Sequence, residues 1–249
     1  MTSRKRVKYY LNNFNSISDR YNQAEKISEI SNVKSINILS SDDKNNKIEF
    51  EYYEDYITLR KWCNSLLLKN IHLTVKIEEV FENIGVFIAK YHGMPPSSNA
   101  DKYQLLEVNS KKHTQFNCFL HGDLTDNNIL INDNYEVIII DWEPTPIVNL
   151  FFNYGNALWD IVWFSNTLLR PSPGTFFKTR TRINFVKRFL EGYEKVHHID
   201  LVSFFLYFDN NVSKLVTKIY KNKDPYHKLL YKKHLKNWKT LEKQLLPVG

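Results

Sequence analysis

One short stretch of the chain concentrates side chains that could move a proton and bind a metal ion. Residues 121–130 read HGDLTDNNIL, in which Asp123 precedes Asn128 by five positions. A second aspartate, Asp141, ends the apolar run VIIID thirteen residues after Asn128. Transfer of the γ-phosphoryl group of ATP to a hydroxyl needs a carboxylate that accepts or orients the hydroxyl proton, and oxygen ligands that hold Mg2+ on the phosphates. Asp123 suits the first role, and Asn128 and Asp141 suit the second.

β-structure is expected on both sides of this stretch. The segment FNCFL (116–120) reads as a strand, and NILIND (128–133) and YEVIIID (135–141) read as the two strands of a hairpin. Asp123 would then lie on a loop anchored by strands, and Asp141 would lie at the end of one. Such a scaffold would hold the polar side chains in one place.

The remaining segments predict an α+β fold with a small mixed lobe and a larger helical one. The first part reads as strand, helix, strand and strand, over 5–11, 18–31, 33–39 and 47–53. Helices dominate afterwards, over 54–70, 74–94, 154–169 and 181–196. We therefore place a nucleotide-binding lobe in residues 1–53, and a helical catalytic and substrate lobe in residues 54–249.

The composition is that of an ordinary globular protein. Of the 249 residues, 43% are hydrophobic and 24% are charged, which is enough apolar material to bury a core. Glycine is scarce, at seven residues, so the chain can hold few glycine-rich loops. No signal peptide is recognised and no run approaches the ~20 apolar residues of a membrane span, so a cytoplasmic location is the default expectation.

The positive charge belongs to the C-terminal tail. Residues 211–249 carry ten lysines against two acidic residues, whereas the whole chain has a net charge of +7. The tail has an apolar face formed by Tyr231, Leu235, Trp238, Leu241 and Leu245. A final helix docked on the large lobe explains this pattern, and contact with an anionic membrane or an acidic acceptor through the lysines is the alternative. No nucleic-acid-binding module is recognised, so no specific nucleic-acid partner is expected.

The two central motifs resemble those of the aminoglycoside phosphotransferase and choline kinase family, the small-molecule branch of the protein-kinase-like fold. That family has HGD where protein kinases have HRD, and D-W-E or a similar triplet where they have DFG. The corresponding triplets here are residues 121–123 and 141–143. The likeness covers roughly residues 47–195, and it implies a two-lobed kinase-like fold that uses ATP and Mg2+.

The resemblance also assigns roles to residues of the larger lobe. It implies that Asp123 is the catalytic base and that Asn128 and Asp141 are metal ligands. Asp160, in the segment ALWDIVWF, would brace the catalytic loop. His121 would orient the loop rather than act as a base.

The nucleotide-binding residues implied by the resemblance lie in the small lobe. Lys8 would reach the α and β phosphates, and Glu25, or Glu29 one turn later, would pair with it. The backbone near Glu51 and Tyr53 would hydrogen-bond the adenine. Only seven residues precede Lys8, whereas the family's first two strands and their phosphate-covering loop would need about twenty-five. This leaves open a late start of the chain or a reduced lobe.

These features predict an ATP- and Mg2+-dependent phosphotransferase acting on a small-molecule alcohol, such as a sugar, an amino alcohol or a related metabolite. Gly122 replaces the arginine that phosphorylation-switched protein kinases use. One alternative is an atypical small protein kinase, against which Trp142 and Glu143 count because they replace Phe-Gly. The other is a pseudokinase-type binding module that lacks the glycine-rich loop.

Overall fold

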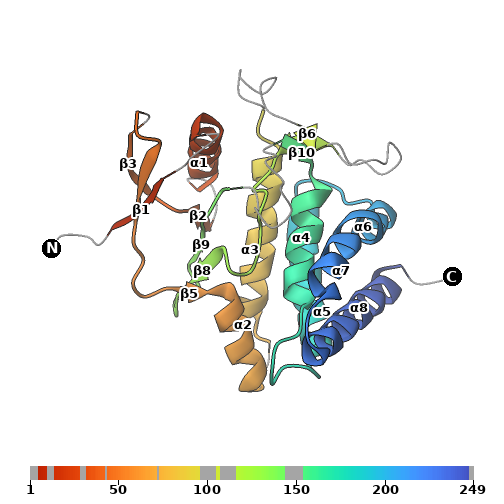
Figure 1. Cartoon of the computed structure of the whole chain (residues 1–249). Coiled ribbons are helices and arrows are strands. Elements are labelled where there is room, and N and C mark those ends of the chain that lie inside the picture. The colour runs from red at the N-terminus through yellow and green to blue at the C-terminus, as the bar shows by residue number, and fades with distance from the viewer. Residues whose placement is uncertain are drawn as a thin grey trace.

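A small sheet and one helix form the N-terminal part of the molecule, and helices make up most of the rest (Figure 1). The computed structural model describes residues 5–9, 14–28, 32–42, 44–71, 73–95, 105–106, 116–143 and 154–246. The small sheet is antiparallel, with the order β1-β4-β3, and consists of β1 (Lys5–Tyr9), β3 (Ile38–Asp42) and β4 (Lys47–Glu51). Helix α1 (Phe14–Ser28) packs the ring of Tyr21 on Phe50 of β4, with 5.0 Å between the ring centroids.

A second sheet carries the predicted hairpin. Its order is β2-β9-β8-β5, from β2 (Val33–Ser35), β9 (Val137–Ile139), β8 (Ile129–Ile131) and β5 (Ile57–Thr58). Strands β8 and β9 are antiparallel, whereas β2 runs parallel to β9. All three residues of β9 are buried, because the strand lies inside the sheet and is covered on both faces. The apolar run before Asp141 is therefore an interior strand.

The large helices pack against this sheet or against one another. They are α2 (Leu59–Leu68), α3 (Val75–His92), α4 (Leu158–Leu169) and α5 (Thr179–Glu194). A Cβ atom on Gly85 would lie 2.1 Å from the carbonyl oxygen of Phe189, and one on Gly192 would lie 2.0 Å from that of Glu82. Glycine at these two positions therefore lets the backbones of α3 and α5 approach each other. Every residue of α4 is buried, which makes it the central helix of the lobe.

The C-terminal segment folds back onto the helical body. It contains α6 (Leu201–Tyr207), a π-helical turn at Phe208–Val212, α7 (Ser213–Lys221) and α8 (Pro225–Leu245). In α8, Trp238 and Leu241 are buried, and the indole of Trp238 stacks on Phe208 with 3.8 Å between ring centroids. The predicted docking of the last helix is confirmed. None of the helices in the described residues combines the length and apolarity needed to cross a bilayer.

Two predicted helices begin later than expected, because short strands precede them. The first begins at Leu59 rather than at residue 54, since β5 pairs with β8 and Thr58 caps the helix through Lys61 N. The second begins at Leu158 rather than at 154, since β10 (Tyr154–Asn156) pairs with β7 (Asn117–Phe119) and with β6 (Leu105–Leu106). The predicted α+β class, with a small N-terminal sheet and a helical remainder, is confirmed.

Candidate active site

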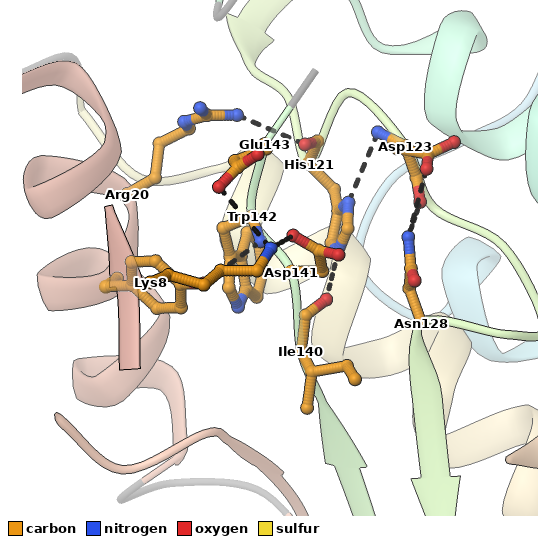
Figure 2. A network of polar contacts seen from close by, with 10 residues as sticks. Lys8, Arg20, His121, Asp123, Asn128, Ile140, Asp141, Trp142 and Glu143 are labelled. Atoms are coloured by element: carbon orange, nitrogen blue, oxygen red, sulfur yellow. Dashed lines mark hydrogen bonds and ion pairs between the residues drawn. The ribbon is translucent and has the colours of Figure 1, made fainter. Parts of the chain in front are cut away.

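The loop after β7 is held by the imidazole of His121. Its Nδ1 accepts a hydrogen bond from the backbone N–H of Asp123 at 3.3 Å, and its Nε2 lies 3.0 Å from the carbonyl oxygen of Ile140 (Figure 2). Burial lowers the pKa of His121 to about 4. The ring is therefore neutral near pH 7, and it links the loop to the end of β9.

The carboxylate of Asp123 has two side-chain hydrogen-bond donors. The amide nitrogen of Asn128 donates to Asp123 Oδ2 at 3.1 Å, and the indole N–H of Trp163 donates to Oδ1 at 3.1 Å. Burial raises the pKa of Asp123, with a further contribution from the nearby charge of Asp141, while the bond from Trp163 opposes the rise. A half-buried carboxylate held by uncharged donors can accept a proton, as a general base must.

Asp141 lies at the end of β9, next to this pair. The register of the hairpin explains why, because Ile140 N donates to Asn128 O at 2.9 Å, opposite the start of β8. Asp141 has a φ of +63°, a left-handed conformation that costs a non-glycine residue on the order of 1 kcal/mol. Its carboxylate pairs with Lys8 Nζ, and Glu143 lies 3.4 Å from the same nitrogen (Figure 2).

The predicted ion pair between Lys8 and Glu25 is wrong. Lys8 pairs with the two acidic residues of the DWE triplet, and Glu25 is exposed. Glu25 cannot face Lys8 because of its position around α1: Tyr21 and Ala24 face the core, and Glu25 points into solvent. The substitute, Glu29, lies outside the described residues.

Asp160 contacts the loop that carries Asp123, as the resemblance implied. It is fully buried on α4, and it accepts hydrogen bonds from His121 N at 2.6 Å and from Gly122 N at 3.0 Å. Gly122 has a φ of +85°, which glycine adopts without strain. His92 Nε2 lies 3.2 Å from the same carboxylate, so this histidine is a buried partner of Asp160.

Glu51 is the last residue of β4, and its side chain interacts with Tyr53 two positions later. The hydroxyl of Tyr53 donates to Glu51 Oε2 at 3.1 Å, and the backbone N–H of Asn37 donates to that hydroxyl at 3.3 Å. The Glu51 amide donates to Asn37 O at 3.0 Å. This cluster lies where the chain leaves the small sheet, and its adenine-binding role stays a prediction.

Three residues at the site escaped the sequence interpretation. Arg20 of α1 is fully buried and donates to the backbone of the catalytic loop. Arg60 Nε donates to Asp126 Oδ1 at 3.1 Å, which ties α2 to the same loop. Trp163 donates to Asp123 Oδ1, and its position one turn after Asp160 on α4 was the available signal that it faces the loop.

The side chains present match the ligands that Mg2+ prefers. The amide nitrogen of Asn128 is used on Asp123, which leaves its amide oxygen available to a cation. Together with the carboxylate of Asp141, this gives one neutral and one charged oxygen, and Mg2+ usually completes its shell with water and substrate phosphates. Among the described residues, no cluster of three or more His, Cys, Asp or Glu side chains is arranged for a metal ion.

The fold is the protein-kinase-like fold of its structural neighbours. The chain is similar to a glucosamine kinase, with a TM-score of 0.58 at 12% identity, covering 98% of this chain and 74% of that one. It is also similar to the aminoglycoside phosphotransferase in the gentamicin–APH(2″)-IIa complex, with a TM-score of 0.53 at 16% identity, covering 98% of this chain and 85% of that one. A third neighbour is the choline kinase LicA from Streptococcus pneumoniae, with a TM-score of 0.49 at 14% identity over 96% of this chain and 87% of that one.

The resemblance inferred from the HGD and DWE triplets is thus confirmed at the level of the fold. No protein-family model matches the sequence. The search of curated proteins likewise gave no match.

Proposed function

We propose that the chain transfers the γ-phosphoryl group of ATP to a hydroxyl of a small molecule, such as a sugar, an amino alcohol or a related metabolite. One observation carries the proposal: Asp123, Asn128 and Asp141 meet at the end of one hairpin, and a lysine from the small sheet reaches the same place (Figure 2). A kinase-like fold shared with a glucosamine kinase and an aminoglycoside phosphotransferase supports it.

Each side chain has a distinct role in this proposal. Asp123 accepts the proton of the acceptor hydroxyl, and Trp163 and Asn128 hold its carboxylate in position. Asn128 and Asp141 would hold Mg2+, which would neutralise charge on the phosphates. The Lys8 ammonium group, which is paired with Asp141 and Glu143 in this structure, can turn to a phosphate oxygen when a nucleotide is bound.

The test is phosphoryl transfer from labelled ATP to a panel of sugars and amino alcohols, with protein substrates in parallel. We expect a small alcohol to be phosphorylated, and Asp123→Asn to lower the rate by about 100-fold or more, since a general base contributes that much. Asp133→Asn is the matched control, because Asp133 is exposed in the turn between β8 and β9. Transfer to proteins alone would favour the atypical protein kinase. Equal rates for the two variants would refute the assignment of the base.

A binding measurement separates an enzyme from a scaffold. MgATP should raise the melting temperature, because a ligand present at about 100 times its Kd stabilises the folded state by about 2.7 kcal/mol. Asp141→Asn should reduce the part of this shift that depends on Mg2+, and Asp133→Asn should not. The absence of any shift at millimolar MgATP would favour the pseudokinase-type module.

A further inference from the structure

Arg20 is a buried cation that contacts the catalytic loop. Its side chain is fully buried on α1. Its Nε and Nη2 atoms have no hydrogen-bond partner among the described residues. A guanidinium in the protein interior is strongly unfavourable unless hydrogen bonds and a negative charge compensate it. The described contacts of Arg20 therefore have to account for its position.

Those contacts are with the backbone on one side of the loop. Arg20 Nη1 donates to His121 O at 3.1 Å (Figure 2). The same nitrogen donates to Leu120 O at 3.4 Å. On the other side, Asp160 accepts from His121 N at 2.6 Å and from Gly122 N at 3.0 Å. Two consecutive peptide groups are thus held at their oxygen ends by a cation and at their N–H ends by an anion. Each charge is aligned favourably with both peptide dipoles, so Arg20 and Asp160 compensate each other through the loop.

The segment held in this way leads directly to the proposed base. His121 lies between the two held peptide groups, and its ring accepts the backbone N–H of Asp123 and reaches Ile140 O. A shift of this segment would displace the carboxylate of Asp123 and loosen its link to the strand that carries Asp141. Arg20 belongs to α1, so it connects the small lobe to this segment.

We propose that Arg20 is a positioning residue for the transfer reaction, holding the 120–122 backbone against Asp160 so that Asp123 is aligned with the acceptor hydroxyl. This proposal rests on the proposed function. Arg20 does not touch the reacting atoms, and its effect should therefore appear in the rate of the bound complex and not in the binding of ATP.

The test compares Arg20→Met, which keeps the length but removes the donors and the charge, with Arg20→Lys, which keeps the charge. Lys26→Met on the exposed side of α1 is the matched control. Folded protein is quantified first by circular dichroism and thermal unfolding. We then measure kcat and KM for ATP, and amide hydrogen exchange at His121 and Gly122 by NMR.

We expect Arg20→Met to lower kcat by about 100-fold per folded molecule, the loss typical of a catalytic group misplaced by about 1 Å, with KM for ATP changed less than about threefold. Amide exchange at His121 and Gly122 should be faster in Arg20→Met than in the wild type. Arg20→Lys should show smaller changes in both kcat and amide exchange, and Lys26→Met should match the wild type. Unchanged kcat and exchange in Arg20→Met would overturn the proposal, as would failure of both Arg20 variants to fold, which would show a purely structural role.

Failure of the proposed function would look different. A wild-type chain that transfers phosphate to no acceptor refutes the function, whereas the exchange rates still report whether Arg20 holds the loop. An active wild type with an equally active Arg20→Met variant refutes the positioning role alone.

Discussion

Replacing Trp163 by phenylalanine should raise the pKa of Asp123 and move the acidic limb of the pH–rate profile to higher pH. The indole N–H donates to Asp123 Oδ1 at 3.1 Å, and phenylalanine keeps an aromatic ring while removing the donor. Trp163 stacks on Trp159 with 5.4 Å between ring centroids and an interplanar angle of 11°, so a phenyl ring can keep part of that packing.

The size of the shift follows from the lost hydrogen bond. A bond to a charged group contributes about 1.5–3 kcal/mol, and the lower end applies because Asp123 is only half-buried. About 1.4 kcal/mol corresponds to one pKa unit. The bond stabilises the ionised form, so its loss favours the protonated acid. Because only the ionised carboxylate can accept a proton, kcat/KM should fall at a pH about one unit higher than in the wild type.

The measurement is kcat/KM against pH for the wild type, Trp163→Phe and Trp159→Phe. Trp159 is the matched control because its indole donates to the carbonyl oxygen of Gly122 at 2.9 Å, a neutral acceptor. We expect the acidic limb to move only in Trp163→Phe. A limb that stays in place, moves to lower pH, or moves equally in both variants would refute the reasoning about the base.

Two further changes test the packing and a buried histidine. Gly192→Ala places a methyl carbon 2.0 Å from the carbonyl oxygen of Glu82, so we expect urea titration to show a loss of about 3 kcal/mol in the free energy of unfolding. In Gly93→Ala the added methyl group meets the movable ring of His197, so this control should lose less than about 1 kcal/mol in the free energy of unfolding. Equal losses in the two glycine variants would contradict the close approach of α3 and α5. Burial lowers the pKa of His234 to about 3, so the unfolded chain binds a proton below about pH 6.5 that the folded chain does not, and stability falls as the pH falls from there toward 3. This amounts to about 2 kcal/mol between pH 7 and pH 5, and His234→Leu should remove about that much of the pH dependence; an unchanged slope would show that His234 does not remain neutral.

The central part of the site was predictable because it is local in the chain. Asp123 and Asn128 lie in the loop before β8, and one hairpin separates Asn128 from Asp141. The apolar run before Asp141 has the length of a buried strand. Once that hairpin forms, its register brings the three side chains together. The contact of Asp160 with the loop was expected from the family resemblance and not from spacing alone.

The contacts made by α1 were not predicted correctly, because in a short polar helix the sequence pattern only weakly indicates which residues face the core. Its buried face includes Ile17, Arg20, Tyr21, Ala24 and Ile27, at helical spacing. Arginine is rarely buried without a partner, so the sequence pattern did not indicate that Arg20 belongs to that face, and the family resemblance pointed to Glu25 as the partner of Lys8. The compensating charge, Asp160, is 140 positions away, and only the folded chain reveals it.

The parallel pairing of β2 with β9 limits how far the small sheet can swing away from the hairpin that precedes Asp141. β2 comes from the predicted small lobe, β9 precedes Asp141, and the ladder continues with Ile36 N donating to Ile139 O at 2.9 Å. A swing of the small lobe about residues 52–56 would break these backbone bonds. The continuous sheet therefore restrains the N-terminal part relative to the hairpin, and in the proposed function the nucleotide would be admitted by rotation of the Lys8 and Glu143 side chains. Structures with and without nucleotide should accordingly differ in rotamers more than in the angle between the lobes.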